Sequence, residues 1–257
     1  MKPIALVVII LISLNSFSQN KTIRAGEKLV YNASYNVFGL LTDIAQVKME
    51  TSEVKANKSI LLRLKCTVTT YEKWDDFFRI RDLYESYVNP KTLTPYLYKR
   101  DVNEGGVYKF MQYKYNHKSK LVKSLKRTKN KKGETLDENK SVRVSSATKD
   151  LVSTLYSIRN MDLDIFSPGD EENLPIIYDN IETTLTVKYH KKETVSTEIG
   201  NTECHKLALS IKGSDILKDN NDNFLWLTAD AKKIPVYAKI KTSLGNGEFK
   251  IVSATEQ

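Results

Sequence analysis

The segment DNNDN, which begins at Asp219, is the part of the sequence that most resembles a metal-binding loop. With Asp219 as position 1 of an EF-hand loop, Asn221 and Asn223 would supply oxygen ligands at positions 3 and 5. Position 6, where the sharp turn needs Gly, is Phe224, and position 12, which needs a bidentate Glu, is Asp230. Asn and Asp also favour β-turns, because their side chains bond their own backbone. We therefore interpret the segment as a turn between strands, and expect neither a metal nor another cofactor.

Histidine and cysteine residues do not form a recognisable catalytic or metal motif. His117, His190 and His205 lack the spacing of zinc ligands, and so do Cys66 and Cys204. The chain also lacks a Gly-x-Ser-x-Gly elbow, a phosphate-binding loop and a dinucleotide fingerprint. These absences favour a protein that is not an enzyme. An active site assembled only by folding is the alternative.

Two arrangements of the cysteines are open. An oxidising compartment permits a disulfide between Cys66 and Cys204. Alternation within the expected strands places Cys66 on an apolar face with Leu64 and Val68, and Cys204 on a face with Lys206. This difference favours two buried free thiols that pack as small apolar groups.

Aromatic and charged side chains offer a different chemistry, the contact of a ligand or partner. Trp74 stands in YEKWDDFF, and Arg100, Asp101 and Glu104 stand in YKRDVNEGG. Aromatic rings can stack on a sugar or line a lipid pocket, and these charges can bind a polar headgroup. The same residue types are also common on plain sheet faces, and we favour an ion-pair network for the charges. The candidate contacts are Trp74, Tyr84, Tyr98, Arg100, Glu104 and Trp226.

A basic segment covers residues 117–133, where eight residues are Lys or Arg and none is acidic. It holds much of the excess behind the formal net charge of +9. We interpret it as a solvated hairpin tip that discourages edge-to-edge aggregation. The alternative is a patch that binds an anionic envelope partner, and the lack of interleaved aromatic residues argues against nucleic acid. The patch consists of Lys123, Lys126, Arg127, Lys129, Lys131 and Lys132.

Period-two alternation dominates the chain and predicts about a dozen β-strands. Residues 181–189 give the clearest alternation, and residues 77–88 predict one long strand. Asn246 and Gly247 predict a tight hairpin turn near the C-terminus, because both accept a positive φ cheaply.

Helical spacing is clear only at about residues 147–160, where Ser146 or Thr148 is the candidate N-terminal cap. One helix among many strands predicts a mainly β fold: a curved antiparallel sheet, an incomplete β-barrel or a sandwich, with the helix packed against it. We expect a single domain over residues 19–257, with 167–175 as a candidate hinge between its halves.

Residues 1–18 have the features of a secretory signal peptide. Lys2 precedes an apolar run from Ile4 to Ile12, and Ser16 and Ser18 fit the small-residue positions of a signal-peptidase site. The run is shorter than the roughly 20 residues that span a bilayer. We therefore expect cleavage between Ser18 and Gln19, a mature chain without a transmembrane segment, and a periplasmic or secreted location.

Several segments, taken in order, resemble the bacterial DUF3108 family. The opening GEKLVYNASYNVFGLLTDIA (26–45), the hairpin DLYESYVNPKTLTPYLYKRDVNEGG (82–106) and the helix DLVSTLYSIRNMDL (150–163) fit its pattern. The closing strands at 200–213 and 224–242 do so as well. The resemblance implies an exported, β-rich envelope protein. Because the family is one of unknown function, it implies no catalytic residues.

Together these features favour a monomeric, non-enzymatic module that binds an apolar or amphipathic envelope molecule in the concavity of its sheet. One alternative is an envelope interaction or structural protein that acts through a sheet edge or through the basic segment 117–133. A less favoured alternative is a glycan-active or hydrolytic enzyme without a recognisable motif. The expected ligand is apolar or anionic, and no nucleic-acid partner is expected.

Overall fold

A computed structural model describes residues 19–37, 39–57, 59–129, 133–211, 217, 222–242 and 245–255 of the chain. Most of these residues belong to one antiparallel sheet of 14 strands. The strands follow one another across the sheet in the order β8-β7-β6-β5-β4-β3-β2-β1-β14-β13-β12-β11-β10-β9. Strands β1 and β14 therefore meet in the middle of the sheet, and β8 and β9 are its two edges.

Neighbours in the sheet are also neighbours in sequence, apart from the meeting of β1 with β14, so short connections suffice. The N-terminal strands are β1 (Lys28–Val37), β2 (Leu40–Ala56), β3 (Ser59–Thr70), β4 (Arg81–Val88), β5 (Pro95–Glu104), β6 (Val107–Asn116), β7 (Leu121–Lys129) and β8 (Thr135–Arg143). The C-terminal strands are β9 (Glu171–Tyr178), β10 (Ile181–Thr197), β11 (Gly200–Ile211), β12 (Phe224–Thr228), β13 (Pro235–Thr242) and β14 (Gly245–Thr255). The helical elements are α1 (Glu72–Asp75), α2 (Leu151–Arg159) and the 3-10 turn η1 (Leu163–Ile165).

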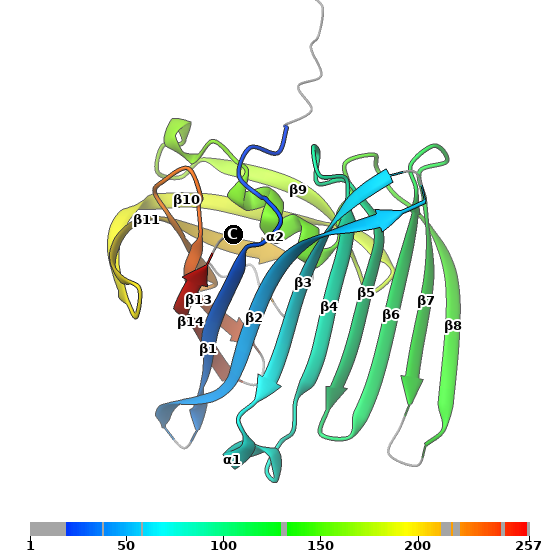
Figure 1. Ribbon diagram of the computed structural model, residues 1–257, viewed down its shortest axis with the longest axis horizontal. Coiled ribbons are helices and arrows are strands. Elements are labelled where there is room, and N and C mark those ends of the chain that lie inside the picture. The colour runs from blue at the N-terminus through cyan, green and yellow to red at the C-terminus, as the bar shows by residue number, and fades with distance from the viewer. Residues whose placement is uncertain are drawn as a thin grey trace, which may run out of the picture.

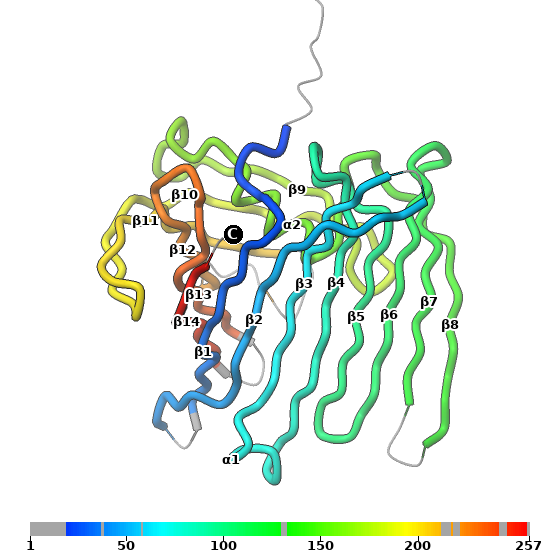
Figure 2. Tube along the Cα trace, in the orientation of Figure 1, coloured from blue at the N-terminus to red at the C-terminus, as the bar shows by residue number. Residues whose placement is uncertain are grey.

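The sheet curls until its two ends approach each other, as accumulated strand twist requires. In Figure 1 and Figure 2, β1–β8 form a broad curved wall, and β9–β11 cross its inner side near one end. The β9–β10 turn reaches the other half, where the Asn180 backbone N–H donates to the hydroxyl of Tyr113 at 3.2 Å. Ser124 donates to the Asn180 side chain, and Lys126 pairs with Asp179 at 2.8 Å. The expected curved sheet, an incomplete barrel with a packed helix, is confirmed.

Helix α2 lies inside the curl and is fixed at both ends. Asp150 caps its first turn by accepting a hydrogen bond from Ser153 N at 2.9 Å, and the Ser153 hydroxyl accepts one from Asp150 N in return. At the other end, the buried Arg159 forms a two-pronged ion pair with Glu27, at 2.7 and 2.6 Å. Tyr156 packs into the larger hydrophobic cluster, to which β1–β7 contribute together with residues of the C-terminal strands, and Ile158 packs into that of β9–β12. The helix therefore joins two hydrophobic clusters of the protein.

Some local expectations were wrong. The cap of the helix is Asp150, rather than Ser146 or Thr148, and the long strand expected at 77–88 begins only at Arg81. Asn246 and Gly247 do not form a turn.

Both residues belong to β14, where Gly247 pairs with Tyr35 on one side and Ile240 on the other. Pairing on two sides holds this glycine in a central strand against its local turn preference. The second half of the candidate hinge at 167–175 belongs to edge strand β9.

Within the described residues, no helix is long and apolar enough to cross a membrane.

Candidate functional site

Strand pairing gathers several candidate contacts at one place on the concave face. Tyr84 of β4 lies opposite Arg100 of β5, and Tyr98 lies opposite both Ser86 and Tyr113. Residues directly opposite in an antiparallel sheet share a face, and this face carries the buried rings of Tyr98 and Tyr113. We call this group the concave-face cluster, which consists of Asp82, Tyr84, Tyr98, Arg100, Glu104 and Tyr178.

Arg100 holds a partly buried positive charge with no carboxylate partner among the described residues. Its Nε atom is buried and has no hydrogen-bond partner in the described part of the chain. Its guanidinium carbon lies 6.0 Å from the ring centroid of Tyr178, on edge strand β9. Buried charges are normally paired, and a cation–π contact of about 1 kcal/mol replaces only part of the lost hydration. The arrangement can therefore accept an anion.

Tyrosine hydroxyls supply uncharged donors on the same face as this guanidinium. The rings of Tyr98 and Tyr113 stack with their centroids 5.5 Å apart. The hydroxyls of Tyr98 and Tyr115 are buried and lack a partner among the described residues. Burial raises the pKa of both phenols well above its usual value, so both keep their protons and can donate.

Asp82 gives the cluster a group that titrates near neutral pH. Burial raises the pKa of this carboxyl, the hydrogen bond from Asn103 N at 3.0 Å opposes the rise, and the adjacent Glu104 carboxyl adds to it. The resulting pKa is about 6. Tyr84 also donates to Asp82, at 3.4 Å. Below that pH the cluster loses a negative charge and becomes a better anion site.

Glu104 and Arg100 do not form the ion-pair network that we favoured for this segment. Arg100 contacts Tyr178, whereas Glu104 contacts Asp82. The reason is their spacing on β5, because four residues of extended strand place Arg100 and Glu104 about 13 Å apart.

The basic segment is mostly a strand rather than a hairpin tip. Residues 121–129 form β7, and strand alternation splits their charges between two faces. Lys126 lies opposite Met111 on the concave face and pairs with Asp179. Lys123, Arg127 and Lys129 point to the convex face, where Arg127 pairs with Asp137 at 2.6 Å. Lys131 and Lys132 lie outside the described residues.

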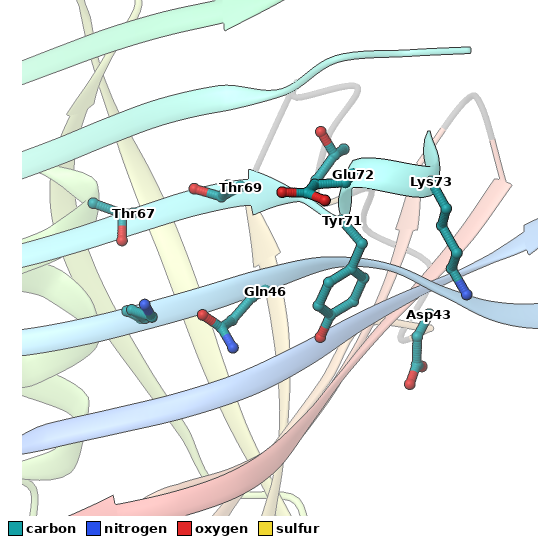
Figure 3. A pocket seen from close by; sticks show the side chains of 9 residues that line it. Asp43, Gln46, Thr67, Thr69, Tyr71, Glu72 and Lys73 are labelled. Carbon is teal, nitrogen blue, oxygen red and sulfur yellow. The ribbon is translucent and has the colours of Figure 1, made fainter. Parts of the chain in front are cut away.

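Trp74 lies away from the cluster, on α1. Its Nε1 donates to the backbone oxygen of Asp43 at 3.0 Å, which ties α1 to β2. The groove beside it has a volume of about 730 Å³, and Figure 3 shows side chains of β2 and β3 facing those of α1. The lining is polar, unlike that of an acyl-chain pocket: Asp43, Gln46, Lys48, Thr67, Thr69, Thr70, Tyr71, Glu72 and Lys73.

Trp226 is also separate from the cluster. It lies opposite Tyr237 of β13 and belongs to the same buried hydrophobic cluster as Ile251. It is buried there, and its Nε1 donates to Glu193 at 2.7 Å. The ammonium of Lys206 lies 5.0 Å from its ring centroid. Both the ring and the Nε1 atom of Trp226 therefore have partners within the protein.

The remaining candidates have structural partners. Both Cys66 and Cys204 are free thiols, in agreement with the arrangement that we favoured. Of the proposed calcium-like segment, residues 219–221 lie outside the described residues. Asn223 is buried and its side chain accepts from Lys241 N at 2.7 Å, which suits a residue that joins strands.

Sequence reasoning missed Asp82 and Tyr178. Asp82 alternates with Tyr84 along β4, so period two could have placed it on the same face. No local pattern could have joined Tyr178 to Arg100, because the contact depends on the curl of the whole sheet.

The fold belongs to a class of mainly β proteins built on one long, curled antiparallel sheet. A β-barrel-like protein of domain of unknown function DUF1849 from Brucella abortus shares this fold, with a TM-score of 0.54 and 8% sequence identity. The alignment covers 91% of this chain and 99% of that one.

The chain itself belongs to the DUF3108 family, described as a protein of unknown function, whose model matches residues 30–252. A predicted exported protein with a YmcC-like fold from Bacteroides fragilis NCTC 9343 aligns with a TM-score of 0.35 at 9% identity, covering 91% of this chain and 98% of that one. A predicted lipoprotein from Parabacteroides distasonis ATCC 8503 aligns with a TM-score of 0.34 at 12% identity, covering 91% and 97%. No curated protein matches the chain.

Proposed function

We propose that this protein is an exported, non-enzymatic binding protein that holds an anionic amphiphile on its concave face. The acid group of the ligand contacts Arg100, and its apolar part lies along the concave face. The protein acts as a monomer in the periplasm or outside the cell, without a nucleic-acid partner. The signal-peptide features of residues 1–18 support the export.

The unpaired charge of Arg100 is the observation that carries the proposal. A guanidinium presents its N–H donors in a planar fork that matches a carboxylate or a phosphate. The partnerless hydroxyls of Tyr98 and Tyr115 add donors on the same face. Two apolar side chains adjoin Arg100 there: Met111 lies opposite it, and Val102 follows it on the strand. A ligand that meets both kinds of contact has an acid group and an apolar part, and is therefore an anionic amphiphile.

Displacement of a fluorescent fatty-acid probe tests the proposal. Oleate should compete for the probe, whereas oleyl alcohol, which has the same chain without the acid, should compete at least about tenfold more weakly. A charge-assisted hydrogen bond contributes about 1.5–3 kcal/mol, so Arg100→Gln should weaken oleate binding about 10- to 100-fold.

Arg127→Gln is the matched control, because this exposed arginine lies on the convex face and pairs with Asp137. Its oleate affinity should equal that of the wild type. Absence of saturable probe binding, or equal competition by acid and alcohol, would reject the proposal.

A further inference from the structure

One end of the sheet carries bulky apolar side chains that the described part of the chain leaves exposed. Antiparallel pairing in sequence order puts the β1–β2, β3–β4, β5–β6 and β7–β8 connections at the same end. Figure 1 shows α1, in the β3–β4 connection, at the same lower end as the β1–β2 hairpin. The exposed fractions are 72% for Leu40, 55% for Leu41, 75% for Phe77 and 47% for Phe78. We call these four residues the apolar rim.

Contacts between the connections hold the apolar rim in place. Trp74 binds the Asp43 backbone, which joins the α1 segment to the strand that begins at Leu40. The Trp74 and Phe77 rings meet edge to face, with centroids 6.4 Å apart. Phe78 packs on the β5–β6 turn so closely that a Cβ atom on Gly105 would lie 2.9 Å from its ring. The exposed side chains therefore stand on a fixed support.

The chemistry of the apolar rim fits a lipid bilayer better than a protein partner. A protein interface needs a contiguous apolar core with matching shape. Here the apolar side chains come from two different connections, and exposed charged residues flank Phe77 and Phe78 in the sequence. A bilayer needs no shape match, since each connection can enter the boundary between headgroups and acyl chains on its own.

Charge on the α1 segment suits a zwitterionic surface. The exposed charges of the α1 segment are balanced, with Glu72 and Asp76 against Lys73 and Arg79. The Trp74 ring contacts that of Phe77. Tryptophan favours the interface of a membrane with water, because its ring has an apolar body and a polar N–H. Balanced charge on α1 implies that its own contact with lipid depends little on salt or on anionic lipid, whereas the exposed Lys129, beside the β7–β8 connection at the same end, adds an attraction to anionic lipid.

We propose that the apolar rim docks this protein on a lipid bilayer, with Leu40, Leu41 and Phe77 inserted at the headgroup boundary. Phe78 and Trp74 stay above them as the support. This docking goes beyond the proposed ligand binding and does not depend on it.

Vesicle flotation with the mature protein and phosphatidylcholine vesicles tests the docking. The wild type should float with the vesicles, and Leu40→Ser/Leu41→Ser and Phe77→Ser should each lower the partition coefficient about tenfold or more. Ile165→Ser is the matched control, because Ile165 is 75% exposed but lies in η1, which follows α2 and is not one of the connections that carry the rim. Its partition coefficient should be unchanged. All these side chains are exposed, so melting temperatures should stay within a few degrees of the wild type.

A fluorescence readout identifies the end that docks. The chain has 2 tryptophans, and Trp226→Phe leaves Trp74 as the single reporter. Lipids brominated on their acyl chains should quench Trp74 in vesicles. No flotation of the wild type, unchanged partition of the rim variants, or unquenched Trp74 would each overturn the docking.

Two further outcomes distinguish docking on a bilayer from dimerisation and from membrane binding through the ligand site. If sedimentation shows a wild-type dimer that the rim variants dissociate, the apolar rim contacts a second copy and the bilayer assignment is wrong. Arg100→Gln should float as the wild type does, even where it no longer binds oleate. A parallel loss of flotation in Arg100→Gln would contradict docking through the rim.

Discussion

The ring of Tyr178 lies over the guanidinium of Arg100, at 6.0 Å, although 78 positions along the chain and nine intervening strands of the sheet separate the two residues. The contact closes the curl across its interior and places an unpaired cation near the buried hydroxyl of Tyr98, which lacks a partner among the described residues. It replaces an anionic partner only in part, since a cation–π contact supplies about 1 kcal/mol. Arg100 is therefore the residue on which the proposed function depends.

Removal of the charge at two interior arginines should have different effects on the free energy of unfolding. Arg159→Met leaves Glu27 buried without a partner, and should lower the free energy of unfolding by about 3–5 kcal/mol. Arg100→Met leaves no unpaired carboxylate and removes a desolvated cation, so it should be neutral or should stabilise by up to about 1 kcal/mol. Urea denaturation of both variants measures the two effects. A large loss of stability in Arg100→Met would show that Arg100 is a structural residue.

The titration of Asp82 should appear in the pH dependence of stability. Its pKa is about 6 in the folded chain, above its ordinary value of 3.8, so the folded state binds more protons between these two values. The contribution of Asp82 to the free energy of unfolding is therefore fully present below pH 3.8 and is lost as the pH rises through 6. Asp82→Asn should therefore match the wild type near pH 4 and exceed it by about 1 kcal/mol above pH 6. A stability difference that is equal at both pH values would contradict this assignment.

Two adjacent glycines with positive φ should differ in their tolerance of a methyl group. Gly105 and Gly106 have φ of +54° and +79°, so each alanine variant bears a backbone cost of about 1 kcal/mol. Only at Gly105 would the new Cβ meet Phe78, at 2.9 Å, whereas no described atom lies within 4 Å at Gly106. Gly105→Ala should therefore be the less stable variant by about 1 kcal/mol or more in denaturant melts. Equal stabilities would mean that Phe78 does not pack on this turn.

The cysteines should be unreactive until the protein unfolds. Burial raises the pKa of Cys66 to about 12 and that of Cys204 to about 11, so neither thiolate is populated at neutral pH. Labelling with iodoacetamide should add two groups only after denaturation, without reductant. Absence of labelling in the denatured, unreduced chain would indicate a disulfide instead.

Local patterns predicted the faces of this sheet better than its long-range closure. Alternation predicted the two strands that carry Tyr84 and Arg100, and in the structure these strands pair so that both side chains lie on one face. Helical spacing predicted the single packed helix. The turn expected at Asn246 and Gly247 failed because β14 pairs on both sides there, and long-range pairing outweighs local preference.

The interpretation of the basic segment as a hairpin tip was wrong for another reason. Charge density suggested a hairpin tip, but alternation within β7 sends Lys126 and Arg127 to opposite faces. The Tyr178–Arg100 contact had no sequence signal at all, because it arises from the twist summed over the whole sheet.

Native mass spectrometry of the protein purified from its exporting host tests the central claim most directly. The wild type should carry a small molecule that, once extracted, ionises as an acid with a long apolar chain. Arg100→Gln, purified in the same way, should lack it, whereas Arg127→Gln should retain it. A wild-type protein that carries no such molecule, or an Arg100→Gln variant that carries as much of it as the wild type, would contradict the account.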